Sequence, residues 1–286
     1  MHRPGWNPTR RNRDLGTAKA GRGQENRMVI PAPAGPVYWE QLSAMTITTR
    51  VVHGRAFPLV IEPTGAGELY PCTVDDVAHA LGLLPAADVF GDDARGIAGV
   101  VLRRPTRKQR ALLPVWGRFL YALDVGPISG MAIVLEAQPV PLRLRRPRRA
   151  DVEDQRELDR LREEADTVAE GRRHVELEFS HRALRSVVLE RTLLHEVGHH
   201  VHYLEEVERP VAADGDDLDQ RWQRFRGRPQ REREDFAHRY AAAWGARLRA
   251  DGAIPFAPRF DRDAWERDGL DPHDFFPADQ LPWPLE

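Results

Sequence analysis

Two histidines and a glutamate in the segment His195-Glu196-Val197-Gly198-His199 are the residues of this chain best suited to chemistry. Side chains at positions i and i+4 of a helix stand one above the other on the same face, so both imidazoles can reach one ion. Zn²⁺ favours histidine nitrogen and tetrahedral coordination. Glu196 follows the first histidine and is expected to point beside the metal, toward the water that the metal holds. The segment therefore predicts a zinc site at His195 and His199, with Glu196 as general base.

A helix must carry this segment, and the surrounding residues predict one over residues 182–208. Ser180 can cap its N-terminus, because a serine hydroxyl accepts from a backbone N–H of the first turn. Apolar residues recur at helical spacing and form one face, which consists of Leu184, Val187, Val188, Leu194, Val197 and Val201. Gly198 is small and leaves room for a partner strand or a substrate backbone.

Residues 192–202 resemble the active-site helix of zincin metallopeptidases. Residues 234–240, Glu-Asp-Phe-Ala-His-Arg-Tyr, are similar to the E-x-F-A-x-x-[FY] segment of lethal-factor-like peptidases and related bacterial families. The resemblance covers residues 175–249 and is to the gluzincin branch, in which a second helix supplies a glutamate as third ligand. It implies that Glu234 completes a zinc site with His195 and His199, and that the substrate is a peptide or protein.

The residue pattern around Glu234 agrees with a second helix. Pro229 suits its first turn, and residues 251–252, Asp-Gly, suit its end. Glu234 and His238 share one face at i+4, where relatives often carry an acidic residue that orients a zinc histidine. Glu232, Asp235 and His238 could replace Glu234 as third ligand. Three further side chains are candidates for orienting a ligand or contacting substrate, namely His238, His202 and Tyr240.

The predicted fold class is α+β, in four regions. Residues 1–36 are expected to be a disordered basic arm. Residues 37–141 are expected to form an α+β region with a mostly antiparallel sheet, with strands at 45–52, 56–61, 96–103, 115–123 and 131–137, and a helix capped by Thr73 and Asp76. Residues 142–252 are expected to form a zincin-like core, and residues 253–286 an aromatic, proline-rich tail packed on it.

Within the predicted core, several shorter elements can be assigned from composition. Residues 139–149, rich in proline and arginine, predict a linker, and residues 151–171 predict a strongly charged helix. Residues 175–179 predict a half-buried strand, and residues 209–228 a connecting loop or a lid. Zincins commonly bind extended substrates along an edge strand, so the resemblance implies that residues 175–179 or 131–137 form that edge.

Composition excludes several classes of protein. The 286 residues carry 42 Lys+Arg against 44 Asp+Glu, a net charge of −2 that argues against a dedicated nucleic-acid binder. One cysteine, Cys72, excludes an intramolecular disulfide framework and fits the cytoplasm. No apolar stretch approaches the roughly 20 residues that span a bilayer, so no membrane partner is expected.

The expected function is therefore that of a zinc-dependent peptidase, in which Glu196 takes a proton from a metal-activated water. Two rival functions belong to different classes. One is that of a catalytically silent module in which zinc fastens two helices together. The second is that of a regulatory or toxin-like protein with a nucleic-acid-associated role, for which residues 103–110, residues 143–149 and the basic arm would supply the charge.

Overall fold

The structure, a computed structural model, describes residues 40–92, 96–105, 116–148, 152–210 and 217–283; at positions 152–154 and 156 it describes the backbone only. Leu42–Glu286 form one compact unit, so the regions predicted to begin at residues 142 and 253 share this unit with the region before them. The predicted basic arm, residues 1–36, lies outside the described residues.

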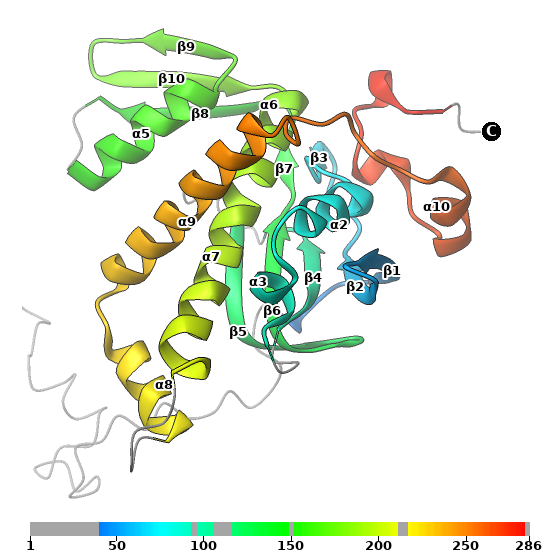
Figure 1. Ribbon diagram of the computed structural model, residues 1–286. Coiled ribbons are helices and arrows are strands. Elements are labelled where there is room, and N and C mark those ends of the chain that lie inside the picture. Colours follow the sequence, from blue (N-terminus) through cyan, green and yellow to red (C-terminus); the bar gives the residue numbers. More distant parts are fainter. Residues whose placement is uncertain (1–39, 93–95, 106–115, 149–151, 211–216, 284–286) are drawn as a thin grey trace, which may run out of the picture. The chain divides into compact units, whose positions relative to one another are not determined.

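A five-stranded sheet forms the centre of this unit, and the fold class is α+β (Figure 1). Its strands in chain order are β1 (Thr46–Val52), β2 (Arg55–Ile61), β4 (Ile97–Arg103), β5 (Gly117–Val125) and β6 (Ile128–Glu136). The spatial order is β1-β2-β4-β6-β5. The strands lie close to the predicted positions, because each is a short β-branched or aromatic run that ends near Gly or Pro.

Strand direction differs from the prediction of a mostly antiparallel sheet. The β1–β2 and β5–β6 pairs are antiparallel hairpins, whereas β4 pairs in parallel with both β2 and β6. The reason is a crossover between β2 and β4, which contains the helices α2 (Val74–Gly82) and α3 (Ala86–Phe90). The predicted capping box of α2 is confirmed: Asp76 N–H donates to Thr73 Oγ1 at 2.9 Å, and Thr73 N–H donates to the Asp76 carboxylate at 3.1 Å.

The predicted helix over residues 182–208 is continuous in space but is π-helical in two of its segments. It consists of α6 (His181–Ser186), the π-helical segment η3 (Val187–Thr192), α7 (Leu193–Tyr203) and a second π-helical segment, η4 (Leu204–Glu208). Ser180 caps it as predicted, accepting from Ala183 N–H at 3.3 Å. π-Helical turns inside α-helices are frequent at functional sites. The apolar face of α7 is buried against the sheet, with Leu193, Leu194 and Val197 at 0–1% exposure.

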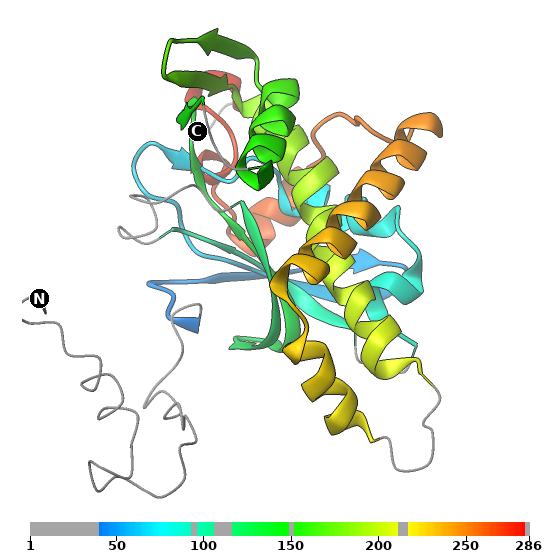
Figure 2. The same cartoon turned by 90° about the vertical axis from the view of Figure 1, so that its left-hand side faces the viewer.

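Two helices follow where a loop and one helix were predicted. The segment α8 (Leu218–Gly227) is helical, so Trp222 lies on a helix rather than in a loop. Residues 211–216 are outside the described part of the chain. The next helix, α9 (Gln230–Ala250), matches the prediction and runs alongside α7 (Figures 1 and 2). Gly198 permits this contact, because a Cβ at position 198 would lie 2.9 Å from Cα of Ala237.

A second, three-stranded sheet has the order β8-β10-β9. It shows that the predictions for residues 139–149 and 151–171 were wrong in part. Its strands are β8 (Leu142–Pro147), β9 (Thr167–Glu170) and β10 (His174–Phe179). The predicted linker contains β8, because its arginines alternate with leucines and pair across the strands with acidic residues of β10. The predicted charged helix ends early, since α5 spans only Val152–Glu164 and is followed by β9.

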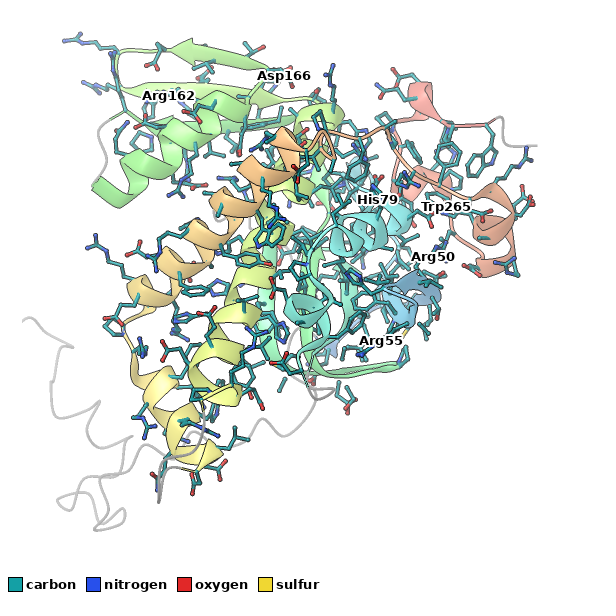
Figure 3. All side chains as sticks on the ribbon, in the orientation of Figure 1. Arg50, Arg55, His79, Arg162, Asp166 and Trp265 are labelled. Carbon is teal, nitrogen blue, oxygen red and sulfur yellow. The ribbon has the colours of Figure 1, made fainter. Side chains whose placement is uncertain are left out.

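The C-terminal segment packs on the opposite side of α2 from α7, as Figure 1 shows for α10 (Arg262–Asp268). Trp265 is fully buried and its indole N–H donates to Asp75 at 2.6 Å; Figure 3 labels it beside Arg50, which pairs with the same carboxylate at 2.5 Å. Phe275 and Phe276 are also buried in the main core. The tail is therefore packed, but mainly against residues 48–79 of the front region rather than on residues 142–252 as predicted.

A two-stranded ladder and two short 3-10 helices complete the described elements. They are β3 (Glu68–Leu69), β7 (Gln138–Pro139), η5 (Pro272–Asp274) and η6 (Ala278–Gln280). Among the described residues, no helix combines the length and the apolar character needed to cross a membrane.

Candidate metal centre

Three donor atoms from α7 and α9 converge at the middle of the helix pair. Nε2 of His195 and Nε2 of His199 lie 3.1 Å apart, and Oε2 of Glu234 lies 3.2 Å from the first and 3.6 Å from the second. A zinc–ligand distance of roughly 2.0–2.1 Å places two ligands of a tetrahedron about 3.3–3.4 Å apart. The three separations scatter around this edge length, so the donors fit one small tetrahedral cation.

The close approach of the helices makes this convergence possible. Gly198 lies on α7 between the two histidines and meets Ala237 of α9, while Tyr240 Cβ would lie 3.1 Å from a Cβ at position 198. Glu234 is three residues before Ala237 and therefore stands about one turn earlier on the same side of α9. The room that Gly198 leaves is thus filled by a helix, rather than by a strand or a substrate backbone.

His238 forms a second possible ligand set with two of these residues. Ligand atoms of His195, Glu234 and His238 all lie within 4.8 Å of one another, so this group could hold a metal ion. One nitrogen of His238 is already engaged, because Arg160 Nη1 lies 3.3 Å from Nε2. This contact, together with the 3.1–3.6 Å separations of the first three donors, favours the set His195, His199 and Glu234, with His238 beside it. Glu232 and Asp235, which the sequence also allowed as third ligand, instead form ion pairs with Arg228 and Arg231.

The charges around the centre are those that a cation needs. Hydrogen bonds from His195 and His199 lower the pKa of Glu234 well below its usual value, so this carboxylate is ionised. Burial, together with the neighbouring His195, lowers the pKa of His238 to about 4, so that imidazole is neutral at pH 7. Nδ1 of His195 is buried and has no hydrogen-bond partner among the described residues.

Glu196 lies beside the donors, between α7 and the sheet. It is 5% exposed, and burial raises the pKa of its carboxyl above the usual value, while a hydrogen bond from the backbone of Phe119 opposes this shift. Gly117 allows strand β5 to approach, since a Cβ there would lie 2.7 Å from Thr192 Cγ2 and 3.4 Å from Glu196 Cγ. A carboxylate with a raised pKa is suited to accepting and returning a proton.

The strand next to the centre differs from both predicted edge strands. Strand β10, which contains residues 175–179, is the middle strand of its sheet, and β6, which contains residues 131–137, lies between β4 and β5. The large sheet ends in β1 on one side and in β5 on the other, and of these two strands β5 is the one that packs against α7. Hydrophobicity could not distinguish these strands, because edge position depends on the order of pairing and not on composition.

Two of the predicted neighbours of the metal have different partners. The Tyr240 hydroxyl donates to Asp88 Oδ2 of α3 at 2.8 Å. Burial raises the pKa of Tyr240 above its usual value, and Asp88 raises it further. His202 stacks on Phe236, with ring centroids 4.3 Å apart and an interplanar angle of 7°. Both contacts hold helices together. Of the two histidines among these candidates, His238 is the one that belongs to a described group able to hold a metal ion.

Several residues near the centre were not singled out from the sequence. Tyr121 of β5 accepts a hydrogen bond from Arg233, the residue before Glu234, and burial raises the pKa of its hydroxyl to about 12. A cavity of about 170 Å³ next to His195 and Glu196 is walled by Trp116, Glu157 and Arg191. Two of them carry a sequence signal, because Arg233 precedes Glu234 and Arg191 stands four residues before His195 on the same helix. Tyr121, Trp116 and Glu157 come from distant segments.

Comparison with models of known protein families, with curated proteins and with solved structures finds no match for this chain. The geometry of the centre is therefore the basis for assigning a function.

Proposed function

We propose that this protein is a zinc-dependent peptidase of the gluzincin-like type. One observation carries the proposal: two histidine nitrogens from one helix and a glutamate oxygen from another lie 3.1–3.6 Å apart, with the carboxylate of Glu196 adjacent in sequence to the first ligand. Three protein ligands leave a coordination position open, which is the pattern of catalytic rather than structural zinc sites. The resemblance of residues 192–202 and 234–240 to zincin segments points to the same activity.

In this proposal His195, His199 and Glu234 would hold the ion. A bound Zn²⁺ would polarise a peptide carbonyl and lower the pKa of water to about 7. Glu196 would accept the proton of the attacking water and then donate it to the leaving amine. The raised pKa of this carboxyl supports both transfers, because it brings the proton affinity of Glu196 closer to neutral pH.

Strand β5 is the proposed partner of the substrate backbone. It ends the large sheet, runs along α7 and already donates a backbone hydrogen bond to Glu196 at Phe119. An extended peptide could add to such an edge through main-chain hydrogen bonds, which tolerate many sequences. The single cysteine, Cys72, is free and buried, which is compatible with a proposed location in the cytoplasm.

The decisive experiment measures hydrolysis and metal content together. The wild-type protein, loaded with one equivalent of zinc, should cleave an unfolded protein such as reduced casein, and chelation should abolish cleavage. Glu196→Gln should retain one zinc and lose cleavage by about 10²–10⁴-fold. A protein that binds zinc at His195 and His199 but cleaves none of a broad set of peptides would instead be a zinc-stabilised interaction module, and the proposal would be wrong.

A further inference from the structure

A groove of about 900 Å³ lies at the C-terminal end of α7, next to strands of the large sheet. Its walls come from β2, β4, β5 and β6 on one side and from α8 on the opposite side. Five aromatic residues line it, namely Phe57, Phe90, Tyr121, Tyr203 and Trp222. We call this feature the aromatic groove. Sites for drug-sized ligands usually measure roughly 300–1,000 Å³ and are mainly apolar, so its size and lining suit a ligand.

The aromatic groove begins one helical turn from the candidate metal centre. Tyr203 follows His199 by four residues on α7, so it stands on the same face about 6 Å farther along the axis. Tyr121 lies across from it, with ring centroids 5.9 Å apart, and is hydrogen-bonded to Arg233, next to Glu234. A chain lying along β5 past His199 would therefore enter the groove.

Two arginines line the aromatic groove and give it positive charge. The guanidinium of Arg55 lies 4.9 Å from the ring centre of Phe90, and that of Arg226 lies 5.6 Å from the ring centre of Trp222. Neither guanidinium forms an ion pair with a described carboxylate, and among the described residues of the lining Asp219 is the single acidic one. An arginine held over a ring keeps its donors directed outward, where a carboxylate can bind them.

We propose that the aromatic groove binds the part of the substrate on one side of the scissile bond and selects a bulky apolar residue with an acidic residue beside it. This inference rests on the proposed peptidase function and names its substrate class. The rings offer apolar and stacking contact to the first side chain, while Arg55 and Arg226 neutralise the second. Basic and small side chains gain neither contact.

Binding to the zinc-loaded Glu196→Gln variant tests this proposal without turnover. Two sets of three blocked hexapeptides are compared by calorimetry. Within each set the peptides differ only in carrying Phe-Leu-Glu, Phe-Leu-Lys or Ala-Ala-Glu, which occupies the second half of the peptide in one set and the first half in the other set. The Phe-Leu-Glu peptide should bind at least about tenfold tighter than either of the remaining peptides, in one of the two placements. Equal affinities in both placements would overturn the proposal.

Two substitutions, each with a matched control, locate the preference. In the same Glu196→Gln background, Arg226→Gln should reduce the preference for Glu over Lys and leave that for Phe-Leu over Ala-Ala, whereas Arg224→Gln, an exposed change on the same helix, should alter neither. Ala122→Trp, at an exposed position of the lining, should abolish both preferences, while Val51→Trp on β1, 73% exposed, should not. Unchanged preferences in Ala122→Trp would place the selection elsewhere.

The outcome separates this proposal from the proposed function. If the wild-type protein hydrolyses peptides but shows no preference, the groove assignment fails and the peptidase stands. If the preference is found but no peptide is hydrolysed with zinc present, the groove is a peptide-binding site of a protein that is not a peptidase.

Discussion

The carboxylate of Glu234 lies 3.2 Å from Nε2 of His195, although the two residues belong to different helices. Without a metal, an imidazole N–H can hydrogen-bond this carboxylate; with a metal, the same nitrogen and oxygen could both serve as ligands. The same oxygen lies 3.6 Å from His199, so the three donors form a nearly equilateral triangle. This relationship leads to the first prediction.

Single substitution of a ligand should remove the metal. His195→Ala, His199→Ala and Glu234→Gln should each lower zinc affinity by at least about 10²-fold, since each removes one of three protein ligands. Glu232→Gln is the matched control on the same helix, because Glu232 only approaches Arg228 at 3.8 Å. Zinc content after dialysis, measured by elemental analysis, should remain near one equivalent only in the wild type and the control. Zinc retained by Glu234→Gln but lost by His238→Ala would assign the third ligand to His238.

The close contact of α7 and α9 at Gly198 should be required for stability and for the metal centre. Gly198→Ala places a methyl group 2.9 Å from Cα of Ala237, which the backbone must accommodate by moving. Such overpacking costs about 1–3 kcal/mol. Gly82→Ala, at the end of α2, is the control, because the new Cβ meets nothing within 4 Å. Its only expected effect is the higher helix propensity of alanine compared with glycine, which Gly198→Ala shares. Urea unfolding should show Gly198→Ala to be the less stable variant by that amount; equal stability would contradict the assigned contact.

His202 should make stability depend on pH. Burial lowers its pKa to about 4 in the folded protein, against a value of about 6.5 when unfolded. The unfolded state therefore binds more protons between these two pH values, and stability falls as pH falls from about 6.5 toward 4. At about pH 5 the loss from this residue is at most about 2 kcal/mol, a value that residual solvent contact reduces.

The variant His202→Phe isolates this contribution, because a phenyl ring can keep the stacking on Phe236 without a titrating group. Urea unfolding at about pH 7.5 and about pH 5, with chelator present throughout, should show a smaller loss of stability in the variant than in the wild type. The same pH dependence in both proteins would show that His202 is protonated normally in the fold.

The ion pair of Asp76 with Arg185 should contribute far more to stability than exposed pairs do. The two side chains are 0% and 11% exposed and meet at 2.7 and 2.8 Å in a bidentate arrangement that ties α2 to α6. Removing one partner leaves a buried charge, so Asp76→Ala should cost about 3–5 kcal/mol. Glu178→Gln removes a pair with Arg143 whose side chains are 42% and 75% exposed, and should cost below about 1 kcal/mol. Comparable losses in the two variants, measured by urea unfolding, would disprove the difference.

Local pattern was sufficient to predict most elements of this fold. The helix with His195 and His199, the helix with Glu234, the capping box of Thr73 and the strands of the large sheet all lie near their predicted positions. Each depends on residues within a few positions of one another, where periodicity, capping and turn residues act. The errors occurred where local patterns compete, as in residues 139–149, which form β8 although proline and arginine suggested a linker.

Long-range pairing decided the remaining features. Strand β4 is parallel to its neighbours because of a crossover, and β5 rather than β6 or β10 lies at the edge next to Glu196, neither of which is encoded in the residues of one strand. The sequence by itself determined which side chains could bind a metal ion and on which helices they stand. Only the tertiary structure decided that Gly198 admits α9, that Glu234 then reaches His195 and His199, and that Tyr240 and His202 are held elsewhere, because those distances depend on how the helices pack.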